Sequence, residues 1–404
     1  MNRIVRIFGL VGLVLLAACS TPKGPGGLAD KTSFDPALME AYLRDTYEGR
    51  VVGFSYAINH DQLLARVGAW GYARRPEDGG LAMTPETRMH VASVSKNVNA
   101  VYFLNVLRQI RELKGAGYAG LDDAVSPWLP DGWVQGMGFA GPGGVTFAQL
   151  LTHRSGLGQL FDAMSEQDQK SWGNDWAGLE FVVANGAIPG AEPAYKNANH
   201  ALFRILTPQL IRASGLRNLV EVTEATAGVI YVELLNQFVF APIGIARVDC
   251  RFDRAGNYAY YYDHDGPRTK GFVFDRSDQD CGGHAGLQLS ALELARYLAY
   301  VRYSDAVLDD AARAEMYGRG LGWWGEGVVT GDAASARLYH GGDWYTWYDG
   351  KEEYPEHVAE LHTCVLAFPR KVEAVLLINS SLPAGTPKPC DALVAAYEAA
   401  LVAP

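Results

Sequence analysis

The sequence predicts an α+β protein in which helices flank an antiparallel sheet built from both chain ends, with a mostly helical domain inserted between them. β-prone runs lie near both ends of the chain, and much of the middle has the apolar spacing of helices. Of the 404 residues, 49% are hydrophobic and 20% are charged, which excludes disordered and fibrous classes. A chain of this size and composition can bury a large core.

The first 18 residues have the features of an export signal, because Arg3 and Arg6 precede an apolar run over 7–18 that is too short to span a bilayer. The run ends in Leu-Ala-Ala-Cys, which resembles the lipobox of bacterial lipoproteins. That resemblance implies a lipid on Cys19, with residues 19–33 as a tether to the periplasmic face of the outer membrane. A plain cleaved signal peptide is the alternative.

The first elements expected after the tether are two β-prone runs, 51–58 and 62–70, joined by a short polar connection typical of a hairpin. A third β-prone run covers 88–92, and helical apolar spacing follows over 94–114. We therefore expect the chain to enter the sheet early and to leave it through a long helix.

The rest of the chain supplies the helical domain and then returns to the sheet. Expected helices cover 146–152, 200–213, 230–240, 290–303 and 390–402, and expected strands cover 335–340, 361–368 and 373–379. The predicted domains are a signal peptide (1–18), a tether (19–33), an α/β domain (34–96 and 281–404) and a mostly helical domain (97–280).

Ser93 and Lys96 form an S-x-x-K pattern at the expected start of the long helix. Residues three apart project from one helix face, so the lysine would reach the serine hydroxyl. A buried lysine can lose its proton and then deprotonate a hydroxyl. The pattern alone is weak, because Ser20 and Lys23 repeat it in the tether, and a helix N-cap is the alternative role of Ser93.

Two later patterns add candidate polar groups. Tyr195 and Asn197 follow a Pro-Gly turn, and a tyrosine can share a proton with the lysine while an amide holds a substrate carbonyl. His340, Gly341 and Gly342 end a β-like run, where two glycines would let a substrate backbone approach. The alternatives are a surface turn for the first pattern and a hairpin turn for the second.

In this order, the three patterns resemble the motifs of the serine β-lactamase and penicillin-binding-protein superfamily, particularly class C β-lactamase-like esterases and D-amino-acid peptidases. Four more segments resemble stretches of that family in the same order: 144–157, 240–245, 282–295 and 320–323. The resemblance runs from about residue 50 to 380 and implies an α/β sandwich of the β-lactamase type. His153 is expected to brace the loop that carries Tyr195.

The resemblance also implies roles for the matched residues. Ser93 would be the nucleophile, Lys96 the group that helps to deprotonate it, and Tyr195 the relay of protons to the leaving group and from water. Asn197 would orient the acyl group. The backbone N–H groups of Ser93 and Asp343 would form the oxyanion hole, in which losing one donor typically costs about 10²–10³ in rate.

One departure from the family bears on the substrate. Penicillin-recognising relatives usually have Lys and then Thr or Ser where this chain has His340 and Gly341, and those groups bind the substrate carboxylate. We expect a mostly neutral His340 beside a negative Asp343 to hold an anionic β-lactam poorly. Binding of an ester or a less acidic amide would not be weakened in this way.

A second departure is the density of aromatic residues over 343–354, with another group at 258–262. These side chains would either wall an apolar acyl or aryl pocket or pack on themselves. Both interpretations stay open at the level of sequence.

Four cysteines remain after residues 1–18 are removed, which permits two disulfides in an exported chain. Among the three possible connectivities we expect the sequence-near one, Cys250–Cys281 with Cys364–Cys390. Lys and Arg total 35 against 45 Asp and Glu, for a formal charge of −10 without a basic run. Nucleic-acid binding is therefore not expected.

The sequence lacks the G-x-S-x-G, phosphate-loop and H-E-x-x-H patterns, so neither an α/β-hydrolase nor a metal or other cofactor is expected. The acidic and histidine residues of 263–265 fit a solvated loop, and the spacing of His357 and His362 is poor for a metal.

Together these observations predict a lipid-anchored serine hydrolase of the bacterial cell envelope that cleaves a small ester, amide or peptide through an acyl-enzyme on Ser93. An esterase or a D-amino-acid amidase or peptidase is the first interpretation. A β-lactamase or D-Ala-D-Ala carboxypeptidase is the alternative with the same machinery. The altered third motif also leaves open a catalytically inactive binding protein.

Overall fold

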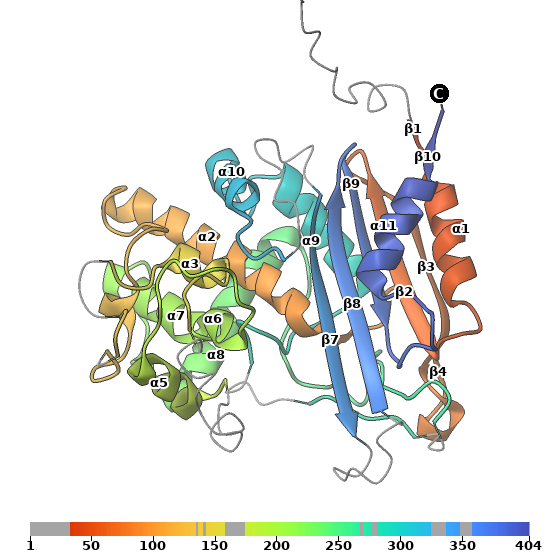
Figure 1. Cartoon of the computed structure of the whole chain (residues 1–404), viewed down its shortest axis with the longest axis horizontal. Helices are drawn as coiled ribbons and strands as arrows, with labels where there is room; N and C mark the ends of the chain where they lie inside the picture. Colours follow the sequence, from red (N-terminus) through yellow and green to blue (C-terminus); the bar gives the residue numbers. More distant parts are fainter. Residues whose placement is uncertain are drawn as a thin grey trace, which may run out of the picture.

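A six-stranded antiparallel sheet forms one half of the molecule, and a mostly helical region lies beside it (Figure 1). The computed structural model describes residues 33–134, 136–139, 143–157, 174–266, 270–275, 281–324, 337–347 and 358–403. The signal peptide, Cys19 and most of the tether lie outside this range.

The strands alternate direction throughout the sheet, whose order is β4-β3-β2-β9-β8-β7. Their bounds are β1 (Ser33–Phe34), β2 (Gly53–His60), β3 (Leu63–Arg74), β4 (Leu81–Ala82), β5 (Met89–His90), β6 (Gln288–Leu289), β7 (Leu338–Trp347), β8 (Val358–Phe368), β9 (Val372–Ile378) and β10 (Leu401–Val402). Because β2 pairs with β9, segments from the two ends of the chain lie side by side at the centre of the sheet (Figure 1). The predicted fold class is confirmed.

The helices are α1 (Pro36–Tyr47), α2 (Ser95–Lys114), α3 (Phe147–Leu151), α5 (Trp176–Asn185), α6 (Asn197–Ala201), α7 (Phe203–Ser214), α8 (Glu224–Leu235), α9 (Ala291–Tyr303), α10 (Asp310–Arg319) and α11 (Pro389–Ala399). Short 3₁₀ or π segments are η1 (Pro76–Asp78), η2 (Ala92–Val94), η3 (Ser126–Trp128), η5 (Asn236–Phe240) and η6 (Ala241–Ile243).

Helices cover both faces of the sheet. Helices α1 and α11 pack against one face, and α9 packs against the other (Figure 1). Every residue of β9 is buried for this reason, including Glu373, whose carboxylate accepts a 2.6 Å bond from Arg302 of α9. A buried carboxylate without such a partner would be strongly destabilising.

Helix α2 leads from the sheet into the helical region, and every residue from Ser95 to Leu107 is buried. Its asparagines tie it to its surroundings, since Tyr297 and Tyr231 donate to Asn97 and Asn99 at 2.9 Å. The segment Glu224–Ile243 is apolar enough to span a membrane, but 61% of its most apolar window is buried. We read it as a core helix.

Most expected elements are present, with differences at their ends. Helices α1, α5 and α10 were not expected, although α1 carries a signature of Asp35 as N-cap followed by Pro36. Strand β7 does not stop near residue 340 but continues to Trp347. The His340 motif therefore lies inside a strand, and the hairpin-turn alternative is wrong. The division into two domains stays a prediction.

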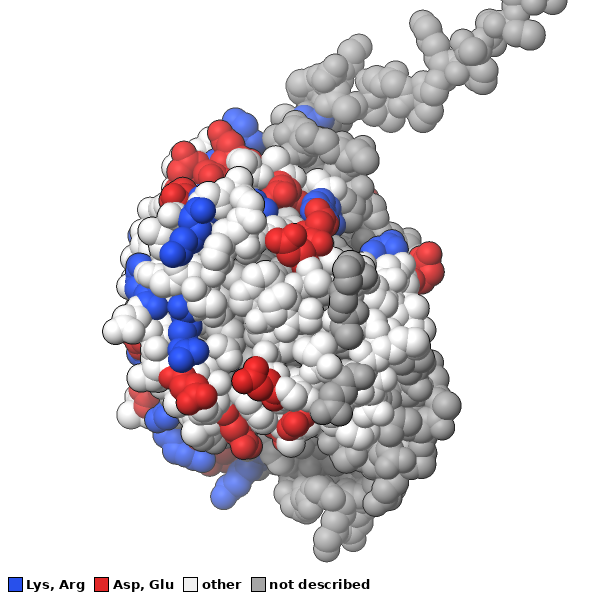
Figure 2. All heavy atoms as spheres, turned by 90° about the vertical axis from the view of Figure 1, so that its left-hand side faces the viewer, with Lys and Arg blue, Asp and Glu red and all other residues white. Residues whose placement is uncertain are grey.

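Both predicted disulfides are confirmed, with Cα–Cα separations of 5.5 Å for Cys250–Cys281 and 5.3 Å for Cys364–Cys390. Disulfides persist in oxidising compartments, which fits a secreted or cell-envelope protein. Figure 2 shows basic and acidic side chains interspersed on the helical face of the molecule, around an uncharged centre. The described residues on this face form no large basic patch of the kind that nucleic acids require.

Candidate active site

Ser93 lies in the turn η2, between the short strand β5 and helix α2, and it is half-buried. The residue before it, Ala92, has a φ of +46°, in the left-handed region that residues other than glycine rarely adopt. Strain of this kind persists only where the surroundings hold it in place. The N-cap of α2 is Val94, so the N-cap alternative for Ser93 is wrong.

The Lys96 side-chain nitrogen lies one helical turn from Ser93 and has three partners. It is 2.9 Å from Ser93 Oγ, 2.8 Å from Asn197 Oδ1 and 2.8 Å from the His284 carbonyl oxygen. The side chain is fully buried, and this burial holds the pKa of Lys96 well below its usual value.

The three partners also suit a neutral amine. Two of them, the amide oxygen of Asn197 and the carbonyl oxygen of His284, can only accept. They take both N–H groups of a neutral Lys96, so the nitrogen lone pair is left for the hydroxyl proton of Ser93. The arrangement can therefore hold a free base against the serine.

Tyr195 lies over this pair, with its ring centre 4.8 Å from Lys96 Nζ. Burial raises the pKa of Tyr195 to about 12, although a hydrogen bond with Ser93 opposes that effect. Its phenol is therefore protonated near neutral pH and can donate a proton. Tyr195 is 37% exposed in a loop, as the surface-turn alternative expects, but its ring also lies against the lysine.

His153 positions the Tyr195 loop as expected. Its ring stacks on Tyr195 at 4.5 Å, and its Nδ1 accepts from the Lys196 backbone at 3.3 Å and from Asn199 Nδ2 at 3.1 Å. Burial lowers the pKa of His153 to about 3, so the imidazole is neutral. Trp324 packs edge-on against the Tyr195 ring at 5.1 Å.

The glycines of the third motif bring strand β7 against the Ser93 turn. A methyl group at Gly342 would lie 2.6 Å from Thr363 Oγ1, 2.7 Å from the Val91 carbonyl oxygen and 2.8 Å from the Ser93 nitrogen. A methyl group at Gly341 would meet Cys390 Sγ at 3.1 Å. The missing side chain of Gly342 thus makes room for the backbone of the serine turn, rather than for a substrate as the sequence suggested.

His340 is buried beside this turn, and its Nδ1 lies 2.8 Å from the Gly341 carbonyl oxygen. Burial and the neighbouring Lys96 lower the pKa of His340 to about 3. The expectation of a neutral His340 therefore agrees with its surroundings.

Asp343 is not an isolated negative charge. Its Oδ1 lies 2.6 Å from His362 Nδ1 and its Oδ2 lies 2.8 Å from Lys388 Nζ, while His362 Nε2 lies 2.7 Å from Glu360. Burial would raise the pKa of Asp343, but the two cationic partners outweigh it and lower the pKa to about 2. The four side chains carry two charges of each sign. The expectation of local repulsion from Asp343 is therefore too simple.

A cavity of about 400 Å³ opens at Ser93 and Tyr195. Strand β7 forms one side of it, and the start of α11, from Lys388 to Asp391, forms another. Trp324 and Tyr339 add aromatic walls. The Cys364–Cys390 disulfide ties α11 to the sheet at this cavity. Sequence reasoning missed these wall residues because they come together only in the fold.

The aromatic residues singled out from sequence mostly pack inward where the structure describes them. Trp344 contacts the rings of Phe274 at 4.8 Å and Tyr261 at 5.8 Å, and Tyr261 is fully buried. Tyr345 is exposed. The packing interpretation is thus confirmed for Trp344, and residues 348–354 lie outside the described range.

The expected solvated loop at 263–265 brings three potential metal-ligand atoms within 4.8 Å of one another. Ser381 Oγ already donates to Asp263 at 2.8 Å and lies 3.0 Å from His264 Nδ1. Local hydrogen bonds account for this arrangement, and we assign no metal to it.

Comparisons with known proteins show what this chain is similar to. A D-aminopeptidase of Brucella anthropi is 25% identical over 297 residues, which are 69% of this chain and 48% of that protein. The chain therefore spans about half the length of that curated relative.

Solved structures show the same fold. A β-lactamase/D-alanine carboxypeptidase from Pseudomonas syringae superposes with a TM-score of 0.61 at 14% identity, covering 90% of this chain and 98% of its own. An octameric penicillin-binding protein homologue from Pyrococcus abyssi superposes with a TM-score of 0.58 at 19% identity, and the match covers 89% of this chain and 76% of that chain. The model of the Beta-lactamase family matches residues 36–397, and the chain belongs to that family.

Proposed function

We propose that this protein is a serine hydrolase that forms an acyl-enzyme on Ser93 and hydrolyses esters or amides. The observation that carries the proposal is the contact of Ser93 Oγ with a fully buried Lys96 whose pKa is held low. Among the described residues no carboxylate contacts Lys96, so an ion pair does not hold the lysine in its charged form. A buried neutral amine can act as the general base that activates a neighbouring serine hydroxyl as a nucleophile.

The proposed reaction moves one proton with each covalent step. Lys96 Nζ accepts the hydroxyl proton of Ser93 as Oγ attacks the carbonyl carbon of the substrate. The backbone N–H groups of Ser93 and Asp343 hold the oxyanion, and the bond to the leaving group then breaks. Tyr195 donates its proton to the leaving atom and regains one from Lys96. Water then attacks the acyl-enzyme in place of the leaving group, the same residues move the protons in the opposite direction, and the acid is released from Ser93.

Amides and peptides of D-amino acids are the proposed natural class, with esters as further substrates. The D-aminopeptidase relative supports this choice. The neutral His340 supports it as well, because relatives that bind a substrate carboxylate usually carry a lysine at this position. A D-Ala-D-Ala carboxypeptidase or β-lactamase is the second candidate, and Lys388 in the cavity wall favours it.

A cell-envelope location with a lipid on Cys19 is part of the proposal. The lipobox-like end of the apolar run supports it, and the two disulfides fit an oxidising compartment. Labelling with a fatty-acid analogue in a bacterial host should mark the wild type and leave Cys19→Ala unlabelled. Equal labelling of both would remove the lipid from the proposal.

The test of the activity is hydrolysis of a p-nitrophenyl short-chain ester and of a D-alanine p-nitroanilide, with Ser93→Ala as the control. The wild type should release product, and its intact mass should gain one acyl group when it is quenched early. Activity that survives in Ser93→Ala would overturn the assignment. A protein that turns over neither compound and gains no acyl mass would favour a binding role.

A further inference from the structure

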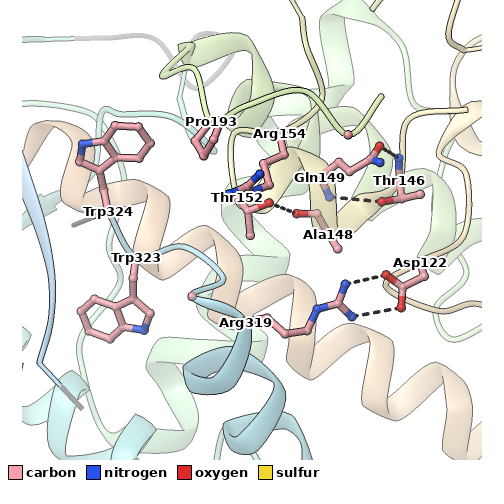
Figure 3. Close-up of a pocket in the computed structure, with 12 residues that line it drawn as sticks. Asp122, Thr146, Ala148, Gln149, Thr152, Arg154, Pro193, Arg319, Trp323 and Trp324 are labelled. Atoms are coloured by element: carbon pink, nitrogen blue, oxygen red, sulfur yellow. Dashed lines mark hydrogen bonds and ion pairs between the residues drawn. The ribbon is translucent and has the colours of Figure 1, made fainter. Parts of the chain in front are cut away.

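A second cavity, of about 600 Å³, adjoins the catalytic one and has no role in the steps above. Helix α3, the loop around Gly190 and Pro193, and the end of α10 enclose it (Figure 3). Its polar wall residues include Thr146, Gln149, Arg154 and Arg319. We call it the Arg154 cavity. A space of this size can hold a small organic group.

The Arg154 cavity and the catalytic cavity share a wall, because Trp324 lines both of them. The indole contacts the Tyr195 ring at 5.1 Å and the His153 ring at 5.3 Å. Pro193, two residues before Tyr195, also lines the Arg154 cavity. A substrate at Ser93 can therefore extend past Trp324 into the second space.

The backbone connects the two cavities as well. The Ala194 N–H donates to the His153 carbonyl at 2.9 Å, and the Gly190 N–H donates to the Arg154 carbonyl at 3.0 Å. The segment that carries His153 and Arg154 is thus bonded to the segment that carries Tyr195. These bonds fix the backbone of Arg154 relative to the loop that carries Tyr195.

Most polar side chains around the Arg154 cavity already have partners. Arg319 donates to both carboxylate oxygens of Asp122 at 2.5 and 3.1 Å, and Thr146 and Gln149 bond each other in a helix-capping box (Figure 3). Thr152 donates to the Ala148 carbonyl at 2.7 Å. These side chains therefore bond other residues of the cavity wall.

Arg154 is different. Among the described residues its one ion pair is with Glu192, at 4.0 Å, and the Arg154 and Glu192 side chains are 47% and 94% exposed. An ion pair this long and this exposed contributes little. Figure 3 shows the Arg154 side chain between Thr152 and Pro193, on the side of the cavity that also carries Trp324. Its guanidinium can bind a carboxylate through two parallel hydrogen bonds.

We propose that the Arg154 cavity is a leaving-group subsite, in which Arg154 binds a carboxylate at the far end of an elongated substrate. This inference rests on the proposed function. We assign the leaving group to this cavity because Tyr195 would protonate the leaving atom, and Trp324, which contacts the Tyr195 ring, lines the cavity. The substrate class is an ester or amide whose alcohol or amine part ends in a carboxylate.

The first experiment compares two acetyl esters of phenols with matched leaving groups. One is a para-acetoxyphenylalkanoic acid, and the other is the same compound with its carboxyl group methylated. In both, the assay follows cleavage of the acetyl ester. Only the first has a carboxylate on its leaving group. Wild-type protein, Arg154→Gln and a control, Arg212→Gln, are assayed for kcat/KM on both. Arg212 is exposed on α7, so the control removes the same charge away from both cavities.

The wild type should prefer the acid to its methyl ester. Arg154→Gln should reduce that preference about tenfold, mainly by raising the KM for the acid. A tenfold loss corresponds to the lower end of the energies of hydrogen bonds to a charged partner. Arg212→Gln should keep the wild-type preference. A wild type without preference for the acid, or an Arg154→Gln variant that keeps it, would overturn the subsite.

The second experiment separates this inference from the proposed function. Calorimetry measures binding of the free para-hydroxyphenylalkanoic acid to Ser93→Ala, and to Ser93→Ala combined with Arg154→Gln. Affinity should fall about tenfold in the double variant. Equal affinities overturn the subsite even where Ser93 is acylated normally. A lower affinity in the double variant supports the subsite even where no turnover is found, in which case only the hydrolase assignment fails.

Discussion

His362 on β8 lies directly opposite Asp343 on β7, and its Nδ1 is 2.6 Å from the Asp343 carboxylate. Its Nε2 is 2.7 Å from Glu360, so both ring nitrogens face carboxylates and must carry protons. Burial lowers the pKa of His362, but the two carboxylates outweigh it and raise the pKa above its usual value. A buried imidazolium therefore supports the strand residue whose N–H we assign to the oxyanion hole.

This pair predicts a pH dependence of stability. The folded-state pKa of His362 is raised, so its stabilising contribution is complete below the unfolded pKa of about 6.5 and is lost as pH rises through the folded value. The charged groups facing His362 are Asp343 and Glu360, and Lys388 bonds Asp343. Urea unfolding from about pH 6 upward should show wild type losing stability relative to His362→Gln. Parallel pH profiles would contradict the charged pair.

The low pKa of Lys96 predicts a falling limb of kcat/KM on the acid side, because an ammonium group cannot accept the Ser93 proton. Tyr195, with a pKa of about 12, should cause no loss between neutral pH and about pH 11. Lys96→Arg keeps a charge that cannot be removed and should lower kcat about 10²–10⁴-fold. A variant as active as wild type, with an unchanged melting temperature, would exclude Lys96 as the base.

Tyr195→Phe should separate amide from ester substrates. An amine must gain a proton to leave, whereas p-nitrophenolate leaves as an anion. The variant should therefore lose about 10² or more in acylation rate on a D-alanine anilide, and much less on the p-nitrophenyl ester. Single-turnover kinetics measure both rates. Equal losses on the two substrates would place Tyr195 outside leaving-group protonation.

Gly342→Ala should disturb the oxyanion site. The added methyl group would lie 2.7 Å from the Val91 carbonyl oxygen and 2.8 Å from the Ser93 nitrogen, so β7 or the serine turn must shift. We expect kcat to fall about 10²–10³-fold, as when an oxyanion donor is lost. Gly117→Ala is the matched control, because a methyl group there meets no atom within 4 Å. Normal kcat in Gly342→Ala would show that this contact is not needed.

Removal of the Cys364–Cys390 disulfide should affect both stability and the catalytic cavity. The bond closes a loop with a sequence separation of 26, so the double alanine variant should lose about 3 kcal/mol of unfolding free energy. It also holds the start of α11, where Lys388 and Asp391 line the cavity. KM should therefore rise as well. A stability loss with unchanged KM would mean that α11 keeps its position without the disulfide.

Local patterns were enough for the parts of this protein that depend on nearby residues. Ser93 and Lys96 meet because three residues make nearly one helical turn, and that spacing is visible in any sequence. The strand pattern at the two chain ends indicated the antiparallel sheet. The two disulfides join the cysteines that are nearest in sequence, which was the expected pairing among three possible ones.

The extent of β7 was harder to predict. We expected the strand to end at His340, with a hairpin turn as the alternative for the two glycines, yet it continues because β8 supplies partners for every residue from Leu338 to Trp347. Helix α1 was missed, although its buried residues Met39, Leu43 and Tyr47 lie four apart. Tertiary contacts outweigh a weak local preference in β7, whereas the local signals of α1 were present and were not used.

The sequence by itself determined the fold class, the family motifs and the pairing of a serine with a lysine, because periodicity and short spacings record local geometry. Only the tertiary structure decided that Lys96 is buried with no carboxylate among the described residues against it, that His362 lies opposite Asp343, and that Trp324 lines two cavities. Strand register and packing bring such residues together from distant parts of the chain, and those contacts set the charges on which the chemistry depends.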